Sequence, residues 1–223
     1  MERREIDHYQ RLAREFRGTP GQIGAGSRQS QEVRFRVIVE LLEGLLGKRW
    51  TRMRLLDFGC GKGDLAPFLQ RHTDFDPVSS YIGLDAIPEN IEDARKLGDF
   101  DVRLGIWDGR GQIVEEEIDL TVFSGALNTS RIGRRKRMFR RMLEMSRVGV
   151  VGNFLTFDPG VKDYGPDNIL LDPETCLKWI DREKFRVRLR LDYLPHDFSV
   201  AAVRWDKGRS QESGRRGREG LRD

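Results

Sequence analysis

Cysteine is scarce in this chain. Cys60 and Cys176 are the only two among 223 residues, too few for a disulfide framework or a structural zinc site. We therefore expect a protein of a reducing compartment, the cytoplasm, with no bound metal ion. Histidine is nearly as rare, and the isolated His8 and His72 are expected at the surface.

Long apolar runs are also missing. No stretch reaches the roughly 18 residues that a membrane span needs, and the opening MERREIDHYQ lacks the apolar region of a secretory signal. We expect neither a membrane partner nor secretion. Hydrophobic residues make up only 38% of the chain, but they gather in blocks that can build a buried core. The length suits one large domain or two small ones.

Acidic residues are absent from one strongly basic segment. Seven of the eleven residues in 131–141 are Lys or Arg, although the whole chain carries a net charge of only +4. Residues 206–223 are rich in Arg and Gly and poor in apolar residues, so we expect a disordered tail. Such a tail can contact nucleic acid, but a solubilising terminus is the favoured interpretation. A basic helix on the outside of a sheet is usually a solvated face.

Apolar blocks of strand length alternate with segments of helical periodicity through most of the chain. The expected helices span residues 3–16, 28–46, 64–71, 89–97, 131–146 and 173–181. The expected strands span residues 53–58, 80–84, 101–104, 118–124, 149–154, 185–193 and 198–205. This order predicts an α/β fold with a doubly wound, mostly parallel, seven-stranded Rossmann-like sheet. The last two strands predict a C-terminal antiparallel hairpin, and the first two helices an N-terminal extension.

A glycine-rich turn joins the first expected strand to the following helix. In LLDFGCGKGDL, Gly59, Gly61 and Gly63 stand where the backbone can approach a ligand, and the helix start offers N–H groups to an anion. Asp85 ends the next strand, 22 residues after Gly63. This is the spacing at which an acid meets ribose hydroxyls in nucleoside-binding sheets. Strand, turn, helix, strand and acid in this order predict a nucleoside site.

The spacing within the turn argues against a dinucleotide. The dinucleotide fingerprint is G-x-G-x-x-G, whereas the third glycine here arrives one residue early. Asp57, two residues before the first glycine, would repel a pyrophosphate but suits a ligand that carries an ammonium group. S-adenosylmethionine has an amine, a carboxylate, a ribose and an adenine.

DFGCGKGDL followed by YIGLDAIPENIEDAR closely resembles the glycine motif and the second-strand acid of class I S-adenosylmethionine-dependent methyltransferases. GAGSRQSQEVRF, SGALN, NFLTF, LDP and HDF resemble stretches of a bacterial, small-molecule-type branch. The resemblance implies the fold predicted above and S-adenosylmethionine as cofactor. It implies that Asp57 and the turn hold the methionine moiety, that Asp85 binds the ribose, and that Ser124, Gly125 and Asn128 lie beside the transferable methyl. The implied cofactor-binding residues are Asp57, Gly59, Cys60, Gly61, Gly63, Asp85, Ala86, Ile87, Trp107, Asp108, Ser124 and Gly125.

Methyl transfer from a sulfonium is an in-line displacement, so proximity and orientation can supply most of the catalysis. A general base is needed only for some acceptors. The candidates for shaping or deprotonating the acceptor are Tyr9, Asn128, Asn153, His196 and Asp197. His196, in LPHDF, has the alternative role of capping the hairpin turn.

Other methylation chemistries fit the sequence poorly. Enzymes that methylate the amino groups of adenine or glutamine carry Asn/Asp-Pro-Pro-Tyr after the fourth strand, where this chain has Ser-Gly-Ala-Leu. A cytosine-C5 mechanism needs a nucleophilic cysteine, and we expect Cys60 and Cys176 to be structural. A metal-assisted mechanism needs clustered acids after the fourth strand, where only Asn128 stands.

We expect a helical extension and lid at residues 1–46, a cofactor-binding domain at 47–205 and a tail at 206–223. The favoured function is methylation of a small molecule by a monomer or homodimer. The alternatives are a methyltransferase that acts on RNA or a ribosomal component, and a catalytically inactive cofactor-binding regulator.

Overall fold

A computed structural model describes residues 3–24, 26–107, 109–165 and 167–205. Seven strands form one sheet in the order β3-β2-β1-β4-β5-β7-β6. The strands are β1 (Leu55–Phe58), β2 (Tyr81–Asp85), β3 (Asp101–Leu104), β4 (Leu120–Ser124), β5 (Gly149–Leu155), β6 (Phe185–Arg190) and β7 (Asp197–Arg204). The first five pair in parallel, and β7 pairs antiparallel to both β5 and β6. The predicted fold, including the C-terminal hairpin, is confirmed.

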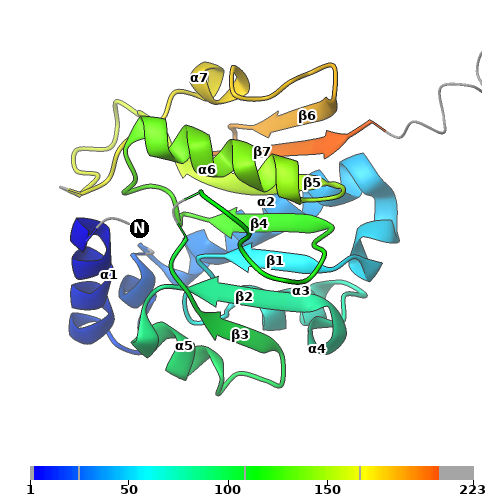
Figure 1. The fold of residues 1–223 in the computed structure, drawn as a ribbon. Helices are drawn as coiled ribbons and strands as arrows, with labels where there is room; N and C mark the ends of the chain where they lie inside the picture. Colours follow the sequence, from blue (N-terminus) through cyan, green and yellow to red (C-terminus); the bar gives the residue numbers. More distant parts are fainter. Residues whose placement is uncertain (1–2, 25, 108, 166, 206–223) are drawn as a thin grey trace, which may run out of the picture.

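Helices cover both faces of this sheet (Figure 1). They are α1 (Arg3–Glu15), α2 (Arg28–Leu46), α3 (Leu65–His72), α4 (Pro77–Ser80), α5 (Pro88–Ala94), α6 (Ile132–Met145) and α7 (Pro173–Leu177), with 3₁₀ turns at Pro20–Ile23 and Gly47–Arg52. One core cluster joins the sheet to α2, α3 and α5, and the other joins it to α6 and α7. The central strands are therefore apolar on both sides, as β5 shows with all seven residues buried.

Local sequence signals account for where several helices begin. Ser27 caps α2 by accepting a hydrogen bond from the Ser30 N–H, and Ser30 bonds back to the Ser27 N–H. Asp172 caps α7 by accepting a hydrogen bond at Oδ2 from the Thr175 N–H. The expected helix at 173–181 ends at Leu177 instead, because residues 178–180 turn into the β6 hairpin. Helix α4 was not predicted, because four residues are too few to show helical periodicity in a sequence.

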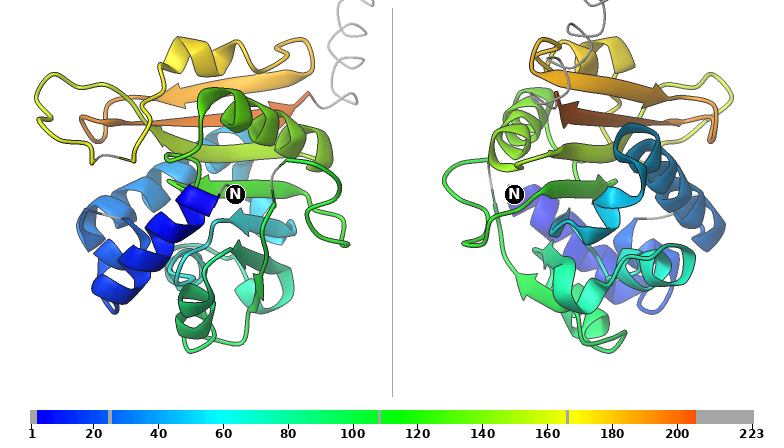
Figure 2. Two further views of the ribbon diagram at one scale, coloured as in Figure 1. Left: turned by 60° about the vertical axis from the view of Figure 1, so that its left-hand side comes forward. Right: turned by 90° about the vertical axis from the view of Figure 1, so that its right-hand side faces the viewer.

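Helix α1 lies across the carboxyl ends of β1, β2 and β4 (Figures 1 and 2). Only Glu5 and Ala13 of its thirteen residues are buried, so apolar burial alone does not hold it in place. Polar contacts to α5 and to the segment before α6 do so. The N-terminal segment thus covers the edge of the sheet where a ligand would enter. The division of the chain into 1–46, 47–205 and 206–223 stays a prediction. The predicted disordered tail, 206–223, lies outside the described residues.

Within the described ranges, no helix is long and apolar enough to cross a membrane.

Candidate functional site

Two connected cavities open between α1 and the carboxyl ends of the parallel strands. The first, here called the Asp85 cavity, has a volume of about 690 Å³. The second, the Asp57 cavity, has a volume of about 720 Å³. The two cavities share the lining residues Tyr9, Ile23, Gly59, Ser124 and Gly125. Such a crevice is where ligands bind in open parallel sheets.

The glycine turn forms the floor between the cavities and requires glycine for two reasons. Gly59, Gly61 and Gly63 have φ angles of +72°, +56° and +79°, which other residues rarely adopt. A Cβ at Gly61 would also lie 2.7 Å from Cγ2 of Ile23. The turn therefore lets both a ligand and the N-terminal segment approach the backbone closely.

Four amide groups of this turn are bonded within the protein, while the expectation that the helix start offers N–H groups to an anion stays a prediction. The Gly59 and Cys60 N–H groups both donate to Leu84 O, and the Gly63 N–H donates to Cys60 O. The Gly61 N–H donates to Asp85 Oδ2 at 2.9 Å. These bonds fix the shape of the turn, so the carboxylates beside it dominate its polar character.

Asp85 ends β2 and lines the first cavity. Besides Gly61, it accepts hydrogen bonds at Oδ1 from the Ile87 N–H at 2.9 Å and from Asn90 Nδ2 at 3.3 Å. Burial raises the pKa of Asp85, and the bonds from Ile87 and Gly61 oppose that shift. A carboxylate offers about four acceptor positions. Three are used by the protein, which leaves limited capacity for a ligand hydroxyl.

Asp57, near the end of β1, lines the second cavity. Tyr81 donates its hydroxyl proton to Asp57 Oδ2 at 2.6 Å, while Oδ1 has no hydrogen-bond partner among the described residues. Burial raises the pKa of Asp57 to about 7, and the negative charges of Asp85 and Asp64 add to that rise. A ligand cation placed at Oδ1 would reverse the shift by stabilising the carboxylate.

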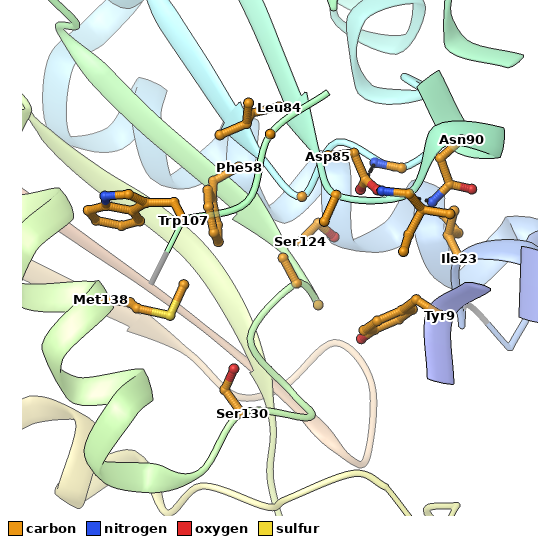
Figure 3. Close-up of a pocket in the computed structure, with 17 residues that line it drawn as sticks. Tyr9, Ile23, Phe58, Leu84, Asp85, Asn90, Trp107, Ser124, Ser130 and Met138 are labelled. Carbon is orange, nitrogen blue, oxygen red and sulfur yellow. Dashed lines mark hydrogen bonds between the residues drawn. The ribbon is translucent and has the colours of Figure 1, made fainter. Parts of the chain in front are cut away.

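The far wall of the Asp85 cavity is apolar. Phe58, Trp107 and Met138 lie on one side in Figure 3, opposite Asp85 and Asn90. Trp107 contacts Phe58 edge to face, with ring centroids 5.8 Å apart, and donates Nε1–H to Arg110 O. Ala86 and Ile87 line the same cavity. Asp108, the other residue predicted here, lies outside the described residues.

The loop after β4 borders both cavities. Ser124 and Gly125 line each of them, and Gly125 has a φ of +75°. Asn128 lines the Asp57 cavity, and its Oδ1 accepts a hydrogen bond from the Leu155 N–H at 3.1 Å. Its Nδ2 is therefore the part of the amide available to a ligand.

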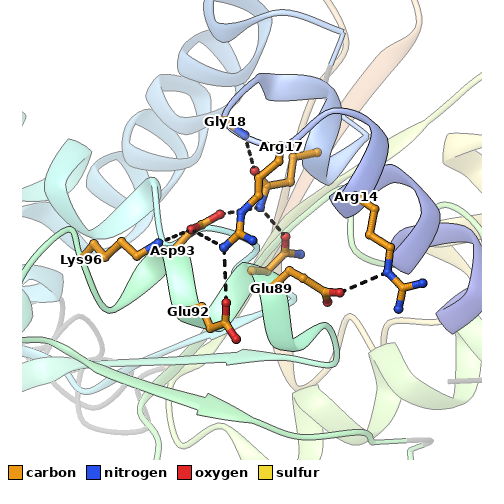
Figure 4. Close-up of polar contacts among 9 residues, drawn as sticks. Arg14, Arg17, Gly18, Glu89, Glu92, Asp93 and Lys96 are labelled. Atoms are coloured by element: carbon orange, nitrogen blue, oxygen red, sulfur yellow. Dashed lines mark hydrogen bonds and ion pairs between the residues drawn. The ribbon is translucent and has the colours of Figure 1, made fainter.

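Polar contacts at both ends of α1 hold it over the site. At one end, buried Glu5 accepts a hydrogen bond from Ser130 Oγ at 2.6 Å and pairs with Arg134 at 3.3 Å. At the other end, Arg14 pairs with Glu89, and Arg17 pairs with Glu92 and Asp93 of α5 (Figure 4).

Tyr9 projects from α1 towards the Asp85 cavity (Figure 3) and also lines the Asp57 cavity. Burial raises its pKa to about 12. A phenol with that pKa stays protonated near neutral pH, so Tyr9 can donate a hydrogen bond but does not act as a base.

Two predicted catalytic residues lie away from these cavities. Asn153, on β5, is 1% exposed, and neither of its amide atoms has a partner among the described residues. His196 contacts the ring of Tyr164 at the hairpin turn, and its backbone O accepts the Thr156 N–H. Neither residue lines the Asp57 or the Asp85 cavity, and their catalytic roles stay predictions.

Both cysteines are buried thiols. Burial raises the pKa of Cys60 well above its usual range and that of Cys176 to about 12. Neither is a ready thiolate nucleophile, which agrees with the structural roles expected for them. Among the described residues, no group of three or more His, Cys, Asp or Glu side chains could hold a metal ion.

Several lining residues were missed by sequence reasoning. Ile23, Arg34, Asn90 and Met138 line one or both cavities. Ile23 is the one large aliphatic side chain in the segment GTPGQIGAG, a signal that could have marked it as a contact of the glycine turn. His8 was expected at the surface and this was wrong: it lines the Asp57 cavity with 15% of its side chain exposed. His72 is exposed as expected.

Comparison with known proteins agrees with this geometry. A family model described as "Methyltransferase domain" matches residues 30–185. The chain belongs to this methyltransferase family. It is an S-adenosylmethionine-dependent methyltransferase of class I, with S-adenosylmethionine as cofactor. A search of curated proteins gave no significant match.

Solved structures share the fold of this methyltransferase. Magnesium protoporphyrin IX methyltransferase (ChlM) from Synechocystis PCC 6803 with bound SAH has a TM-score of 0.63 at 13% identity, covering 90% of this chain and 98% of its own. The sugar N-methyltransferase KedS8 from Streptoalloteichus sp ATCC 53650 has a TM-score of 0.60 at 16% identity, covering 80% and 90%. An S-adenosylmethionine-dependent methyltransferase from Mesorhizobium loti has a TM-score of 0.53 at 19% identity, covering 68% and 91%.

The residues present fit this cofactor. Asp85 lines one cavity and Asp57 lines the other, and the two cavities share five lining residues. A ligand that extends through both can therefore pair a ribose hydroxyl with one carboxylate and an ammonium group with the other. Between them lies the glycine turn, where an added side chain would collide with Ala126 at Gly59 and with Ile23 at Gly61.

Proposed function

We propose that this methyltransferase transfers the cofactor's methyl group to a small-molecule acceptor by in-line displacement. The supporting observation is the cover over the site: Tyr9 and Ile23, from the N-terminal segment, line both cavities. A space roofed in this way suits a small ligand better than a folded polymer. The small-molecule enzymes ChlM and KedS8 share the fold, which agrees with this choice.

The cofactor is proposed to extend through both cavities. Asp85 accepts a ribose hydroxyl, and Ala86, Ile87 and Trp107 border the adenine. Asp57 Oδ1 faces the ammonium group, while Gly59, Cys60 and Gly61 line the floor. Gly63 lines neither cavity and packs towards Ala94 and Phe100. When bound, the cofactor supplies an electrophilic methyl group on a sulfonium. Ser124, Gly125 and Asn128 border the space left for the acceptor, where orientation contributes most to the rate.

Arg34 is proposed as the partner of the methionine carboxylate. It lines the Asp57 cavity, and its Nε donates to the buried Asp197 Oδ2 at 2.7 Å. That bond fixes the guanidinium and leaves the two Nη groups without partners among the described residues. A guanidinium held in this manner pairs well with a carboxylate. Asp197 thereby acts by positioning Arg34 rather than by contacting the acceptor.

A nucleic-acid acceptor is the weaker candidate, because part of the basic segment 131–141 is structural. Arg135 is fully buried, and its Nη2 donates to the backbone O atoms of Asn128, Ser130 and Ile169. Arg134 is buried against Glu5. Two of the basic side chains that suggest a phosphate-binding helix in the sequence therefore have structural roles. Arg135 holds the loop after β4, and Arg134 holds α1.

The experiment is a transfer assay with [methyl-³H]-S-adenosylmethionine and three separate acceptor fractions: an ultrafiltered small-molecule extract, total RNA and total protein. We expect label in the small-molecule fraction, and none with the Asp85→Ala variant. Label in RNA alone would overturn the proposal. Cofactor binding by calorimetry without transfer to any fraction would instead favour the catalytically inactive regulator.

A further inference from the structure

A histidine and an aspartate meet at the rim of the Asp57 cavity. His8 comes from α1, and Asp167 comes from the segment between β5 and α7. His8 Nδ1 lies 2.7 Å from Asp167 Oδ2, with 15% and 23% of the two side chains exposed. His8 lines the same cavity as Ser124 and Asn128. An imidazole supported by a carboxylate therefore faces the space proposed for the acceptor.

The contacts around His8 assign its tautomer. At 2.7 Å from a carboxylate oxygen, Nδ1 must carry the proton and donate it to Asp167. Arg11 Nη2 lies 3.4 Å from Nδ1 and 3.9 Å from Asp167 Oδ2. Because Nη2 and Nδ1–H are both donors, Arg11 acts on the carboxylate and not on the imidazole. Nε2 then keeps its lone pair, and it has no partner among the described residues.

We propose that His8 is the general base of the reaction, oriented by Asp167, and that the acceptor's nucleophile is therefore a hydroxyl or another group that must lose a proton. This inference rests on the small-molecule function proposed above. The acceptor oxygen attacks the methyl carbon as its proton passes to His8 Nε2. The C–S bond breaks, and its electron pair stays on sulfur, giving a neutral thioether. The imidazolium is stabilised by Asp167 until it releases its proton to solvent.

The other groups facing this cavity are poorer bases. Tyr9 stays protonated, because burial raises its pKa to about 12. The available Asn128 Nδ2 group and Arg34 are donors only. Asp57 lies beside the glycine turn with one oxygen bonded to Tyr81, where the cofactor's ammonium group is proposed to bind.

A purely structural role is the competing explanation, since the His8–Asp167 pair also fastens α1 to a distant loop. Single-turnover transfer separates the two, with excess enzyme, [methyl-³H]-S-adenosylmethionine and the ultrafiltered small-molecule extract. We expect His8→Gln to slow transfer roughly 100-fold or more while the Kd for SAH stays within about twofold of that of the wild type, since no cofactor contact is assigned to His8. Asp167→Asn should give a smaller loss. His72→Gln, at an exposed position, is the matched control.

Chemical rescue provides the deciding readout. Added imidazole should restore part of the transfer rate of His8→Ala, because a soluble base can enter the vacated position. A fastening role predicts no rescue, and so does a structural collapse; either result overturns the inference. If wild-type protein labels small molecules and His8→Gln keeps its rate, only this inference fails. If label enters RNA instead, the small-molecule proposal itself fails.

A second measurement does not need the acceptor. Nitrogen-15 spectra of the histidine rings, recorded on the full chain with SAH bound, should show the proton of neutral His8 on Nδ1. Asp167→Asn should shift the tautomer populations. A proton on Nε2 in the wild type would leave no lone pair towards the acceptor and would overturn the proposal.

Discussion

Lowering the pH from 7.0 to 5.5 should weaken the binding of SAH to this methyltransferase through Asp57. Burial holds the pKa of Asp57 at about 7 in the protein without ligand, so below that pH the carboxyl is mostly neutral. The proposed partner, the ligand's ammonium group, needs the charged carboxylate. Binding must then expel a proton, and the Kd rises as the pH falls.

The size of the effect follows from the proton count. Release of one proton changes the binding free energy by about 1.4 kcal/mol per pH unit. Asp57, with a pKa of about 7, is half charged at pH 7.0 and almost neutral at pH 5.5, so the Kd should rise by about 16-fold over this range. Above pH 7 the dependence should flatten, because Asp57 is then already charged. The raised pKa of Asp85 gives the same sign, because a ribose hydroxyl bonds more strongly to a charged carboxylate than to a neutral carboxyl, and the Asp57→Asn variant separates the two contributions.

The assay is calorimetry with SAH at constant ionic strength between pH 5.5 and 7.0, where the ligand's own α-amino group stays protonated. Asp57→Asn should bind more weakly at pH 7 and lose most of the pH dependence. His72→Gln should behave as the wild type does. A wild-type slope preserved in Asp57→Asn would refute the assignment of the ammonium group to Asp57.

The same carboxyl makes an opposite prediction for the stability of the free protein. Its pKa in the folded state, about 7, lies above the usual 3.8, so between these values the unfolded state loses the proton first. Stability should therefore fall as pH rises from about 4 to about 7, by at most about 1.4 kcal/mol per unit, and Asp57→Asn should remove this contribution. Urea unfolding at several pH values measures it.

Three further perturbations test the site and its cover. Asp85→Asn should raise the Kd for SAH by about tenfold or more, because a charge-assisted hydrogen bond contributes roughly 1.5–3 kcal/mol; calorimetry that finds an unchanged Kd would place the ribose elsewhere. Gly61→Ala adds a Cβ at a φ of +56° and 2.7 Å from Ile23. It should weaken SAH binding and increase hydrogen exchange around Ile23. Hydrogen exchange equal to that of the wild type would show that Ile23 does not pack on the glycine turn. Glu5→Gln should remove the negative charge that pairs with buried Arg134. Breaking a buried pair costs about 3–5 kcal/mol, so α1 should open. Hydrogen exchange in α1 should then rise while the sheet stays protected, and unchanged exchange would show that this pair does not hold the helix.

Local patterns determined most of the fold and the cofactor end of the site. The apolar blocks that became β1, β2, β4 and β5 are recognisable because a strand buried on both faces needs an unbroken apolar run. Gly59, Gly61, Gly63 and Asp85 are recognisable because turn, helix start and acid lie within one short stretch of chain. These features depend on neighbours in sequence, and for that reason the sequence by itself was enough to predict them.

The acceptor side was decided by tertiary structure. His8 and Asp167 are 159 positions apart, and their pairing at 2.7 Å follows from how α1 crosses the strand ends, which no local pattern encodes. Glu5 likewise meets Ser130 and Arg134 only in the fold, so a run of basic residues that suggests a nucleic-acid surface turns out to be partly buried. A charged side chain in a sequence carries its chemistry, but its partner, its burial and hence its role depend on which distant residues the folded chain brings beside it.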